Sequence, residues 1–467
     1  MANKDVRIVR NYINGKWVAP KDVETLDVHN PSTGEVIAKT PLSTKQITDD
    51  AIEAAAKAFP KWSSTPVSKR ADSIFELARL LKENEDKICR VLVEEMGKSL
   101  PDAHAEMKRA IENCEVACGM PMLQQGEKLV GISDKIDGEV LCVPVGVFSA
   151  IMPFNFPAMV PFWFLPFAIA TGNTFIIKPS ERVPLTMELI TEYIDKIGLP
   201  PGVFNLVNGD KVVSNALMDS PIVKGISVVG STKVCKIVAE KCAQTGKRYQ
   251  AMGSAKNHLV VMPDAKMDEV VRNMVTSCYG CAGQRCMASS AIVCVGDETY
   301  KKTCDKFVAA SKEVTVADPL DPKYADEKVL MGAVISQTAK ERILGLINDG
   351  IKEGATLALD GRNIKIKGRE KGYYIGPTVF TDVKPGMKIH KTEIFGPVVV
   401  ILKARNFDDA IKIVNSLEYG NGASIYTQNG YYARRFKIEA EAAAKLVDLE
   451  TCYLKPLVRQ YMEGHSG

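Results

Sequence analysis

The chain has 467 residues, of which 46% are hydrophobic and 25% are charged, and its formal net charge is +4. These are the fractions of an ordinary globular protein, and the length predicts more than one domain. Basic and acidic residues are interspersed, which argues against a nucleic-acid-binding surface. The longest apolar stretch, residues 158–170, is too short to span a bilayer, and the charged first ten residues lack the apolar core of a secretory signal.

Cysteine usage bears on the redox compartment. The twelve cysteines are spread along the chain without the spacing of a disulfide scaffold, so we expect reduced thiols and a cytoplasmic location. Cys278, Cys281 and Cys286 lie close in sequence but lack a matched fourth ligand for a metal or an iron–sulfur cluster. We therefore expect no metal, no nucleic acid and no membrane as partners.

The first predicted elements are a hairpin and two helices. Asn14-Gly15 separates two short runs of alternating apolar residues, which is typical of a tight β-turn. Residues 49–59 and 70–96 carry apolar side chains at helical spacing, and the second of these helices is predicted to end near Gly97.

From residue 141 onward, predicted strands and helices alternate. A buried strand over 141–152 is followed by strands at 174–178, 203–207 and 225–229, with helices at 186–197 and 232–245 between and after them. Such alternation implies parallel βαβ units in an open, doubly wound sheet that binds ligands at its strand ends.

A second stretch of the same kind starts at residues 259–262. It contains a helix before Cys286 and strands at 290–295, near Val379 and at 398–402. The predicted fold class is therefore α/β, with two doubly wound α/β domains.

The first motif with chemical potential is Gly283-Gln284-Arg285-Cys286-Met287, directly before an apolar strand. A cysteine attacks as its thiolate, so its free pKa of ~8.5 must be lowered by nearby positive charge or dipoles. Arg285 could supply that charge or could hold a substrate carboxylate. Taken alone, Cys286 is more readily explained as a small buried apolar side chain, the commonest state of a free cysteine.

Two further motifs follow consecutive predicted strands. Pro153-Phe154-Asn155-Phe156-Pro157 holds an asparagine in a stiff turn, and its side-chain amide is a good donor to a developing oxyanion. Lys178-Pro179-Ser180-Glu181 ends the next strand. Each of them could equally be a structural turn.

The last two motifs lie at strand boundaries. Gly230-Ser231-Thr232 joins a strand to a helix, which places backbone N–H groups where a pyrophosphate would bind. The same tripeptide is also a common helix cap. Glu393-Ile394-Phe395-Gly396-Pro397 precedes a strand, where charged residues are usually just solvated.

Together, in this order and separation, these motifs resemble the aldehyde dehydrogenase superfamily from about Asn11 to about Ala442. The resemblance implies an aldehyde-dehydrogenase-like fold, in which a small β oligomerisation element joins the two α/β domains. It divides the chain into an NAD-binding domain over 1–125 and 147–255, bridging strands over 126–146, a catalytic domain over 256–440 and a divergent tail over 441–467.

The resemblance makes Cys286 the nucleophile and Asn155 the oxyanion donor. Glu393 and Phe395 match positions that grip the nicotinamide ribose. Glu181 beside the adenosine ribose would accept hydrogen bonds from its hydroxyls and repel a 2′-phosphate, which favours NAD over NADP. The positions that match NAD contacts in the family are Met152, Phe154, Lys178, Glu181, Arg182, Ser231 and Gly253.

Within the superfamily, three segments are most similar to the methylmalonate-semialdehyde dehydrogenase branch: residues 153–161, Ala255-Lys256-Asn257-His258 and residues 283–288. Hydrolytic members usually have Glu-Leu-Gly-Gly, whose glutamate activates water, where this sequence has Ala251-Met252-Gly253-Ser254. Alanine cannot take a proton, and general-base assistance contributes roughly 10²–10⁴-fold. The thiol of coenzyme A is a far better nucleophile than water, so we expect acyl transfer to coenzyme A.

The remaining expectations concern substrate, assembly and alternatives. Arg109 and Arg285 match positions that bind a substrate carboxylate in this branch, although either could be a surface arginine. The tail shows neither the family's Pro-Phe-Gly-Gly-x-Lys loop nor its last strand, and a homo-oligomer, dimer or tetramer, is expected if the tail allows it. Two other functions stay open: a hydrolytic aldehyde dehydrogenase with Glu393 as base, and a catalytically impaired NAD-binding homologue.

Overall fold

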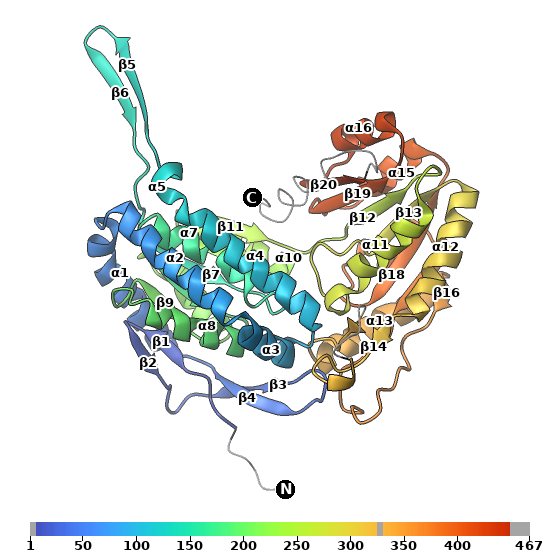
Figure 1. Cartoon of the computed structure of the whole chain (residues 1–467), viewed down its shortest axis with the longest axis horizontal. Helices are drawn as coiled ribbons and strands as arrows, with labels where there is room; N and C mark the ends of the chain where they lie inside the picture. Colours follow the sequence, from blue (N-terminus) through green and yellow to red (C-terminus); the bar gives the residue numbers. More distant parts are fainter. Residues whose placement is uncertain (1–5, 325–329, 449–467) are drawn as a thin grey trace. The chain divides into compact units, whose positions relative to one another are not determined.

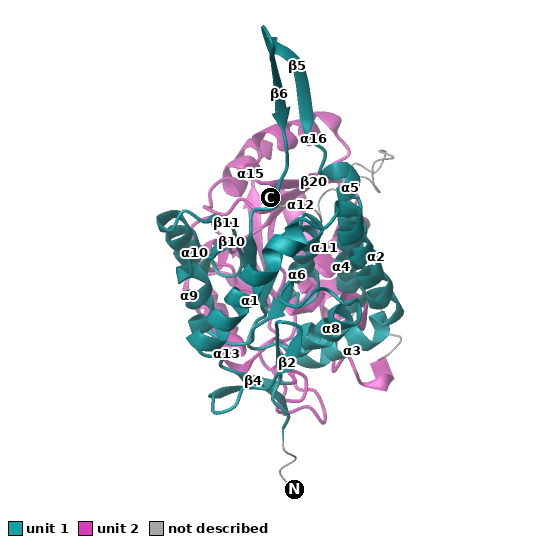
Figure 2. Cartoon of the chain, turned by 90° about the vertical axis from the view of Figure 1, so that its left-hand side faces the viewer, with its two compact units in different colours: residues 1–29, 36–95, 103–253 teal, residues 30–35, 96–102, 254–467 magenta. Residues whose placement is uncertain are grey.

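The computed structural model describes residues 6–324 and 330–448. The chain forms two compact units, coloured separately in Figure 2. Unit 1 comprises residues 1–29, 36–95 and 103–253, and unit 2 comprises residues 30–35, 96–102 and 254–467. Among the described residues, no helix is both long enough and apolar enough to cross a membrane.

Unit 1 is built on a sheet of seven described strands (Figure 1). From one edge to the other they are β11 (Arg248–Met252), β10 (Val223–Val229), β7 (Val147–Ile151), β8 (Thr174–Lys178), β9 (Phe204–Leu206), β1 (Asn11–Ile13) and β2 (Lys16–Val18). Strands β7 to β11 are parallel and lie in the spatial order 5-4-1-2-3. The chain therefore reverses its direction of winding between β7 and β10, which is the topological switch point of a doubly wound sheet.

Helices cover both faces of this sheet. One face packs on α1, α9 and α10, and its apolar layer includes Ile52, Ile176 and Val228. The other face packs on α7, which is itself covered by α2. The helices up to residue 253 are α1 (Lys45–Ser63), α2 (Val67–Glu83), α3 (Glu85–Met96), α4 (Leu100–Cys118), α5 (Met120–Leu123), α6 (Met159–Phe162), α7 (Leu165–Ala170), α8 (Leu185–Lys196), α9 (Lys211–Asp219) and α10 (Thr232–Gln244).

Two predicted elements of unit 1 are shorter than expected. The helix predicted over 70–96 is interrupted at Asn84, which has a φ of −115° and whose side-chain amide donates to the carbonyl of Leu80 at 2.8 Å. The strand predicted over 141–152 begins only at Val147. Pro144 has no N–H, and the Asn173 side chain accepts the N–H groups of Val145 and Gly146, so these donors are not available to a sheet.

Two antiparallel hairpins of unit 1 form outside the helical layers. The predicted turn at Asn14-Gly15 is confirmed, since both residues have positive φ, 53° and 71°, as a type I′ turn between β1 and β2 requires. Strands β5 (Glu127–Ser133) and β6 (Ile136–Val140) form a second hairpin, which projects from unit 1 in Figure 1. A third antiparallel pair joins β3 (Thr25–His29) to β4 (Val36–Pro41).

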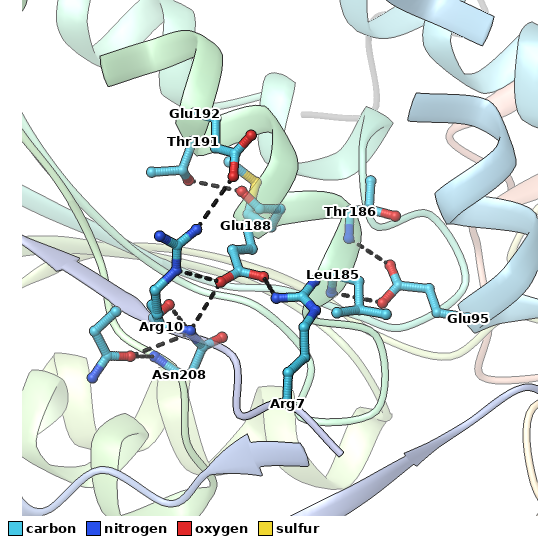
Figure 3. Close-up of polar contacts among 11 residues, drawn as sticks. Arg7, Arg10, Glu95, Leu185, Thr186, Glu188, Thr191, Glu192 and Asn208 are labelled. Atoms are coloured by element: carbon cyan, nitrogen blue, oxygen red, sulfur yellow. Dashed lines mark hydrogen bonds and ion pairs between the residues drawn. The ribbon is translucent and has the colours of Figure 1, made fainter. Parts of the chain in front are cut away.

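Buried carboxylates connect distant segments of unit 1 (Figure 3). Glu188 on α8 accepts hydrogen bonds from Arg7 and from the backbone and side chain of Arg10. Glu95 on α3 accepts the N–H groups of Leu185 and Thr186 at 2.7 and 2.9 Å. Glu95 therefore supplies the N-terminal cap that Pro184 cannot provide for α8.

Unit 2 contains a second sheet of seven described strands. In spatial order they are β16 (Thr356–Leu359), β17 (Thr378–Val383), β18 (Val398–Ala404), β13 (Ala291–Val295), β12 (His258–Val261), β19 (Gly422–Tyr426) and β20 (Ala444–Asp448). All except β16 run parallel. The other described elements are α11 (Met267–Tyr279), η1 (Gly280–Gly283), α12 (Asp297–Lys312), β14 (Thr315–Val316), η2 (Pro322–Tyr324), β15 (Leu330–Met331), α13 (Gln337–Lys352), α14 (Lys388–Lys391), α15 (Phe407–Val414) and α16 (Gly430–Glu439).

Strand β20 lies within the segment 441–467, where the sequence shows no sign of a last strand. It pairs in parallel register with β19, from Gly422 opposite Ala444 to Tyr426 opposite Asp448. The rest of that segment, residues 449–467, lies outside the described residues.

Candidate active site

In unit 1, three of the predicted motifs follow neighbouring parallel strands. Residues 152–157 follow β7, residues 179–182 follow β8, and residues 230–232 follow β10. The carboxyl ends of parallel strands meet at one edge of a sheet, and β7 and β10 flank the switch point. The topology therefore gathers these segments where a doubly wound sheet binds a dinucleotide.

The Lys178 side chain joins the segment 179–182 to the loop that follows β9. Its Nζ is buried and donates to the carbonyls of Pro179 and Gly209, at 2.9 and 2.7 Å, and lies 3.3 Å from a carboxylate oxygen of Glu181. Burial lowers the pKa of Lys178, and the negative charge of Glu181 opposes that shift. Glu181 is only half-buried, and the neighbouring Arg182 is exposed.

The junction of β10 and α10 forms a helix N-terminus close to the end of β11. Ser231 is the N-cap, and its hydroxyl accepts the N–H of Val234. The N–H of Gly230 donates to the carbonyl of Met252. A Cβ on Gly253 would lie 3.1 Å from the Thr232 hydroxyl, so glycine permits this close approach. The N-terminus of a helix favours a bound phosphate because its N–H groups and dipole both point at the anion.

Asn155 is buried, with 4% of its surface exposed, in the loop between β7 and α6. The carboxylate of Glu106 on α4 accepts the N–H groups of Ala158 and Met159 at 2.8 and 3.0 Å, which fixes this loop. Glu106 was not identified as a site residue from the sequence. The available signal was a charged residue on the apolar face of a helix, next to Met107 and Ala110.

In unit 2, the motifs precede their strands rather than follow them. Ala255–Asn257 comes before β12, Cys286 before β13, Glu393–Pro397 before β18 and Asn421 before β19. These strands are parallel neighbours, so their amino ends share one edge of the sheet. The predicted site segments therefore lie at the carboxyl ends of the parallel strands in unit 1 and at the amino ends of the parallel strands in unit 2.

The loop that carries Cys286 is fastened to neighbouring segments through its backbone. The carbonyl of Cys286 accepts hydrogen bonds from the side-chain amides of Asn257 and Asn421, at 2.7 and 3.1 Å. Asn257 also donates to the carbonyl of Ala288 at 3.1 Å. Neither asparagine was identified as a site residue from the sequence, although Asn257 lies in one of the phrases that carry the family resemblance.

Gly283 brings the cysteine loop against the Glu393–Pro397 motif. Its φ is +70°, and a Cβ there would lie 2.1 Å from the carbonyl oxygen of Gly396. Gln284 fastens the same loop on its other side, since its side chain donates to the carbonyl of Cys281 and accepts the N–H of Ile335. These contacts place the cysteine loop and the glutamate motif side by side within unit 2.

The electrostatics of Cys286 differ from the expectation. Burial raises the pKa of the Cys286 thiol most, and the negative charge of Glu393 raises it further. Arg285 and the N–H groups of Cys286 and Met287 lower the pKa, but less. The predicted effect of Arg285 is therefore right in sign, and it is outweighed by burial and by a carboxylate that the prediction did not consider.

Glu393 lies in a polar cluster at the same edge. One carboxylate oxygen accepts the N–H of Ala255 at 3.0 Å, while burial raises the pKa of Glu393. Lys256 is buried, and among the described residues its Nζ has no hydrogen-bond partner. Burial lowers the pKa of Lys256 to about 8, opposed by the charge of Glu393. Phe395 adopts a φ of +51°, an uncommon backbone conformation for an aromatic residue.

The two arginines predicted to bind a substrate carboxylate belong to different units. Arg109 lies on α4 in unit 1 and forms an ion pair with Glu112 at 2.6 Å. Arg285 lies in unit 2, where its guanidinium passes close to Gly280. Asn155 and Cys286 are divided between the units in the same way. Within unit 1 the structure gathers the predicted positions between Met152 and Gly253, and within unit 2 it gathers Arg285, Cys286, Glu393 and Phe395.

Comparison with known proteins agrees with this arrangement. A model of the aldehyde dehydrogenase family matches residues 17–447. The chain belongs to the aldehyde dehydrogenase family. The predicted aldehyde-dehydrogenase-like α/β fold is confirmed by solved structures of the family with TM-scores up to 0.92.

Several relatives are similar over nearly their whole length. The chain is 44% identical to malonate-semialdehyde dehydrogenase 1 of Geobacillus kaustophilus, over 94% of this chain and 88% of that protein. It is 42% identical to malonate-semialdehyde dehydrogenase of Pseudomonas aeruginosa, over 93% and 86%. A putative methylmalonate-semialdehyde dehydrogenase of Sinorhizobium meliloti, solved with NAD, superposes with a TM-score of 0.92 at 39% identity, over 96% of this chain and 90% of that one.

Proposed function

We propose that this aldehyde dehydrogenase oxidises a small carboxylate-bearing semialdehyde, such as malonate or methylmalonate semialdehyde, with NAD, and transfers the acyl group to coenzyme A. The names of its relatives support the substrate class. The observation that carries the choice of acceptor is the sequence from Lys247 to Met262, which contains no aspartate or glutamate. The general base of the hydrolytic members has no counterpart in this segment.

Unit 1 offers a suitable binding site for NAD. The switch point between β7 and β10, the N-terminus of α10 and the close approach at Gly253 together form a cradle for a pyrophosphate. Glu181, oriented by Lys178, would accept hydrogen bonds from the adenosine ribose. The other contacts proposed for NAD are Met152, Phe154, Arg182 and Ser231 in unit 1, with Glu393 and Phe395 in unit 2.

The proposed reaction proceeds through a thioester on Cys286. The Cys286 thiolate attacks the aldehyde carbon, and the Asn155 amide donates to the oxygen that becomes negative. NAD, when bound, would supply the acceptor for the hydride of this hemithioacetal carbon, and loss of that hydride leaves the thioester on Cys286. The thiolate of coenzyme A then attacks the thioester carbonyl, and the Cys286 thiolate leaves as the acyl-CoA forms. Asn257 and Asn421 hold the carbonyl of Cys286 throughout, so the sulfur keeps its position.

The proposal extends to the domains and the compartment of the enzyme. We assign residues 1–125 and 147–255 to NAD binding, 126–146 to subunit association and 256–440 to catalysis. Every cysteine among the described residues is a free thiol, which supports a reducing, cytoplasmic compartment.

The acceptor is tested by following NADH from malonate semialdehyde with and without coenzyme A. Without coenzyme A we expect a burst of about one NADH per Cys286, followed by slow turnover, because the thioester persists. Added coenzyme A restores rapid turnover and yields malonyl-CoA. Equal steady rates without it would show hydrolysis. In that case Glu393, whose pKa is raised by burial, is the candidate base, and Glu393→Gln should abolish the water-dependent rate.

The same experiment distinguishes an active dehydrogenase from a catalytically impaired NAD-binding homologue. A catalytically impaired homologue would bind NAD, as measured by titration calorimetry, but would give no NADH burst. Cys286→Ala should abolish the burst and retain NAD binding, which excludes loss of folding as the cause.

The two arginines are tested by comparing substrates with and without a carboxylate. Arg109→Gln and Arg285→Gln are each compared with the unsubstituted enzyme. The variant that has lost the carboxylate-binding arginine should show a raised KM for malonate semialdehyde and an unchanged KM for propanal. Arg79→Gln, at an exposed site on α2, is the matched control.

A further inference from the structure

Three side chains of different chemistry converge in unit 1, on helices that carry none of the proposed NAD contacts. Glu85 and Cys89 are one helical turn apart on α3, so they share a face, and His104 lies opposite them on α4. The Nδ1 of His104 is 2.8 Å from a carboxylate oxygen of Glu85 and 3.6 Å from the sulfur of Cys89. The three ligand atoms all lie within 4.8 Å of one another.

The orientation of the His104 ring argues against a proton relay between the thiol and the carboxylate. In a relay, the imidazole contacts the thiol with one nitrogen and the carboxylate with the other. Here Nδ1 faces both groups, while Nε2 lies 3.6 Å from a carboxylate oxygen of Asp86. In a metal-bound histidine the second ring nitrogen usually donates to a carboxylate, and rotation of the exposed Asp86 side chain would bring it into hydrogen-bond distance.

We propose that Glu85, Cys89 and His104 bind a divalent transition-metal ion, with Zn²⁺ as the best match to the donor set. Thiolate, imidazole and carboxylate are all zinc ligands, and the two anionic groups balance the charge of the ion. Binding releases the proton of the Cys89 thiol. The metal bridges α3 to α4 and thereby stabilises unit 1.

The surroundings leave room for a fourth ligand. A cavity of about 440 Å³ borders Glu85 and His104, so a water molecule can complete a tetrahedron. Lys82 and Lys108 line this cavity and oppose a cation. Glu115 and Glu85 line it as well and offset them, while Glu112 is already paired with Arg109. Cys89 itself is fully buried, which protects its thiolate from competing ligands in solution.

The test uses Co²⁺ as a spectroscopic probe on the full chain after treatment with a chelator. A Cys286→Ser background removes the proposed nucleophile as a competing thiol. We expect one Co²⁺ per chain, with a thiolate-to-metal charge-transfer band in the near ultraviolet and the intense visible bands of tetrahedral Co²⁺, and displacement of both by Zn²⁺. Zn²⁺ should also raise Tm, because only the folded state presents the three ligands together.

The variants identify the ligands. His104→Gln and Glu85→Gln change half-buried positions, so they preserve folding better than Cys89→Ser, and each should weaken binding at least tenfold and abolish the Tm shift. His29→Gln on β3 and the exposed Cys142→Ser are matched controls that should leave both signals unchanged. Absence of a saturable charge-transfer band, or a band of unchanged strength and affinity in His104→Gln, would overturn the proposal.

Discussion

Asn257 makes two hydrogen bonds to the backbone of the loop that carries Cys286. Its side-chain amide donates to two carbonyls of the cysteine loop, those of Cys286 and Ala288, whereas Asn421 donates to the first alone. All three segments precede parallel strands of one sheet, so these bonds connect amino ends that are far apart in sequence. The position of the sulfur therefore depends on residues outside the cysteine loop.

Asn257→Ala should lower kcat by roughly 10²-fold, because a displacement of about 1 Å at a reacting atom has an effect of that size. KM for NAD should change less than kcat, since most of the proposed NAD contacts lie in unit 1. Asn421→Ala removes a longer bond to the Cys286 carbonyl and a weak contact with the Met287 sulfur, and it should have a smaller effect. Asn348→Ala, at an exposed position bonded to Arg362, is the control. A kcat for Asn257→Ala within twofold of the unsubstituted enzyme would contradict this role.

The titration of Cys286 gives a second prediction at this scale. Burial and Glu393 raise the pKa of the thiol, so the thiolate fraction at neutral pH is below that of an ordinary cysteine. Without NAD, the rate of Cys286 alkylation should rise with pH, with a midpoint above the ordinary value of about 8.5. Glu393→Gln removes a negative charge and should move the midpoint to lower pH.

The measurement is the rate of iodoacetamide labelling of the peptide that contains Cys286, followed by mass spectrometry across pH. Labelling of the exposed Cys142 in the same samples is the internal control. An unchanged midpoint, or a shift to higher pH, would show that Glu393 does not act on the thiol.

Among the elements, the cysteine loop and the segment before β18 make a contact that leaves no room for a larger side chain. Gly283 needs both a left-handed backbone and the absence of a Cβ, because the carbonyl of Gly396 occupies that space. The pair His258 and His390 secures the same region, with an Nε2–Nε2 distance of 2.9 Å between β12 and α14. Both rings are buried, and burial lowers the pKa of each, so the pair is neutral at physiological pH.

Gly283→Ala should destabilise the protein by about 1–3 kcal/mol, from the strained φ and the collision with Gly396 together. Activity should fall further than stability, because the loop must move away from the Glu393 motif. Gly345→Ala is a matched control with the opposite expectation. Gly345 is an exposed position of α13 with open space at its Cβ, and alanine there should stabilise the helix by up to about 1 kcal/mol. Equal Tm values for the two variants would refute the packing argument.

At the scale of the whole molecule, the hairpin β5–β6 carries apolar side chains that are exposed to solvent in a single chain. Val130 and Ile132 are 70% and 55% exposed, and Leu129, Ile136 and Val140 on the same hairpin are also exposed. A long apolar hairpin with open edges is a typical association surface. We propose that it joins subunits of a homo-oligomer, as expected for residues 126–146.

The double variant Val130→Lys, Ile132→Lys should dissociate this assembly, because burying two lysines at an apolar interface is costly. Light scattering should then report a mass near that of one chain, 51.0 kDa, against a multiple of it before substitution. Phe75→Lys, at a similarly exposed apolar site on α2, should leave the mass unchanged. A mass of one chain before substitution, or no change in the double variant, would exclude the hairpin as the interface.

The local order of strands, helices and motifs could be predicted from the sequence, because turn chemistry and hydrophobic period act over a few residues. Strand β8 and helix α10 lie within a residue of their predicted bounds, and the turn at Asn14-Gly15 has the predicted conformation. The break at Asn84 and the late start of β7 could not be predicted from the hydrophobic period alone. Each depends on a hydrogen bond of a side-chain amide, that of Asn84 to the Leu80 carbonyl and that of Asn173 from the Val145 N–H.

The sequence by itself therefore determined the family fold, the reactive residue types and the absence of an acidic residue near Ala251. Only the tertiary structure decided which distant groups act on them. Glu393 raises the pKa of Cys286 across 107 positions of chain, and Asn421 holds its carbonyl from 135 positions away. Such pairs follow from the order of parallel strands in a sheet, which local propensities do not specify.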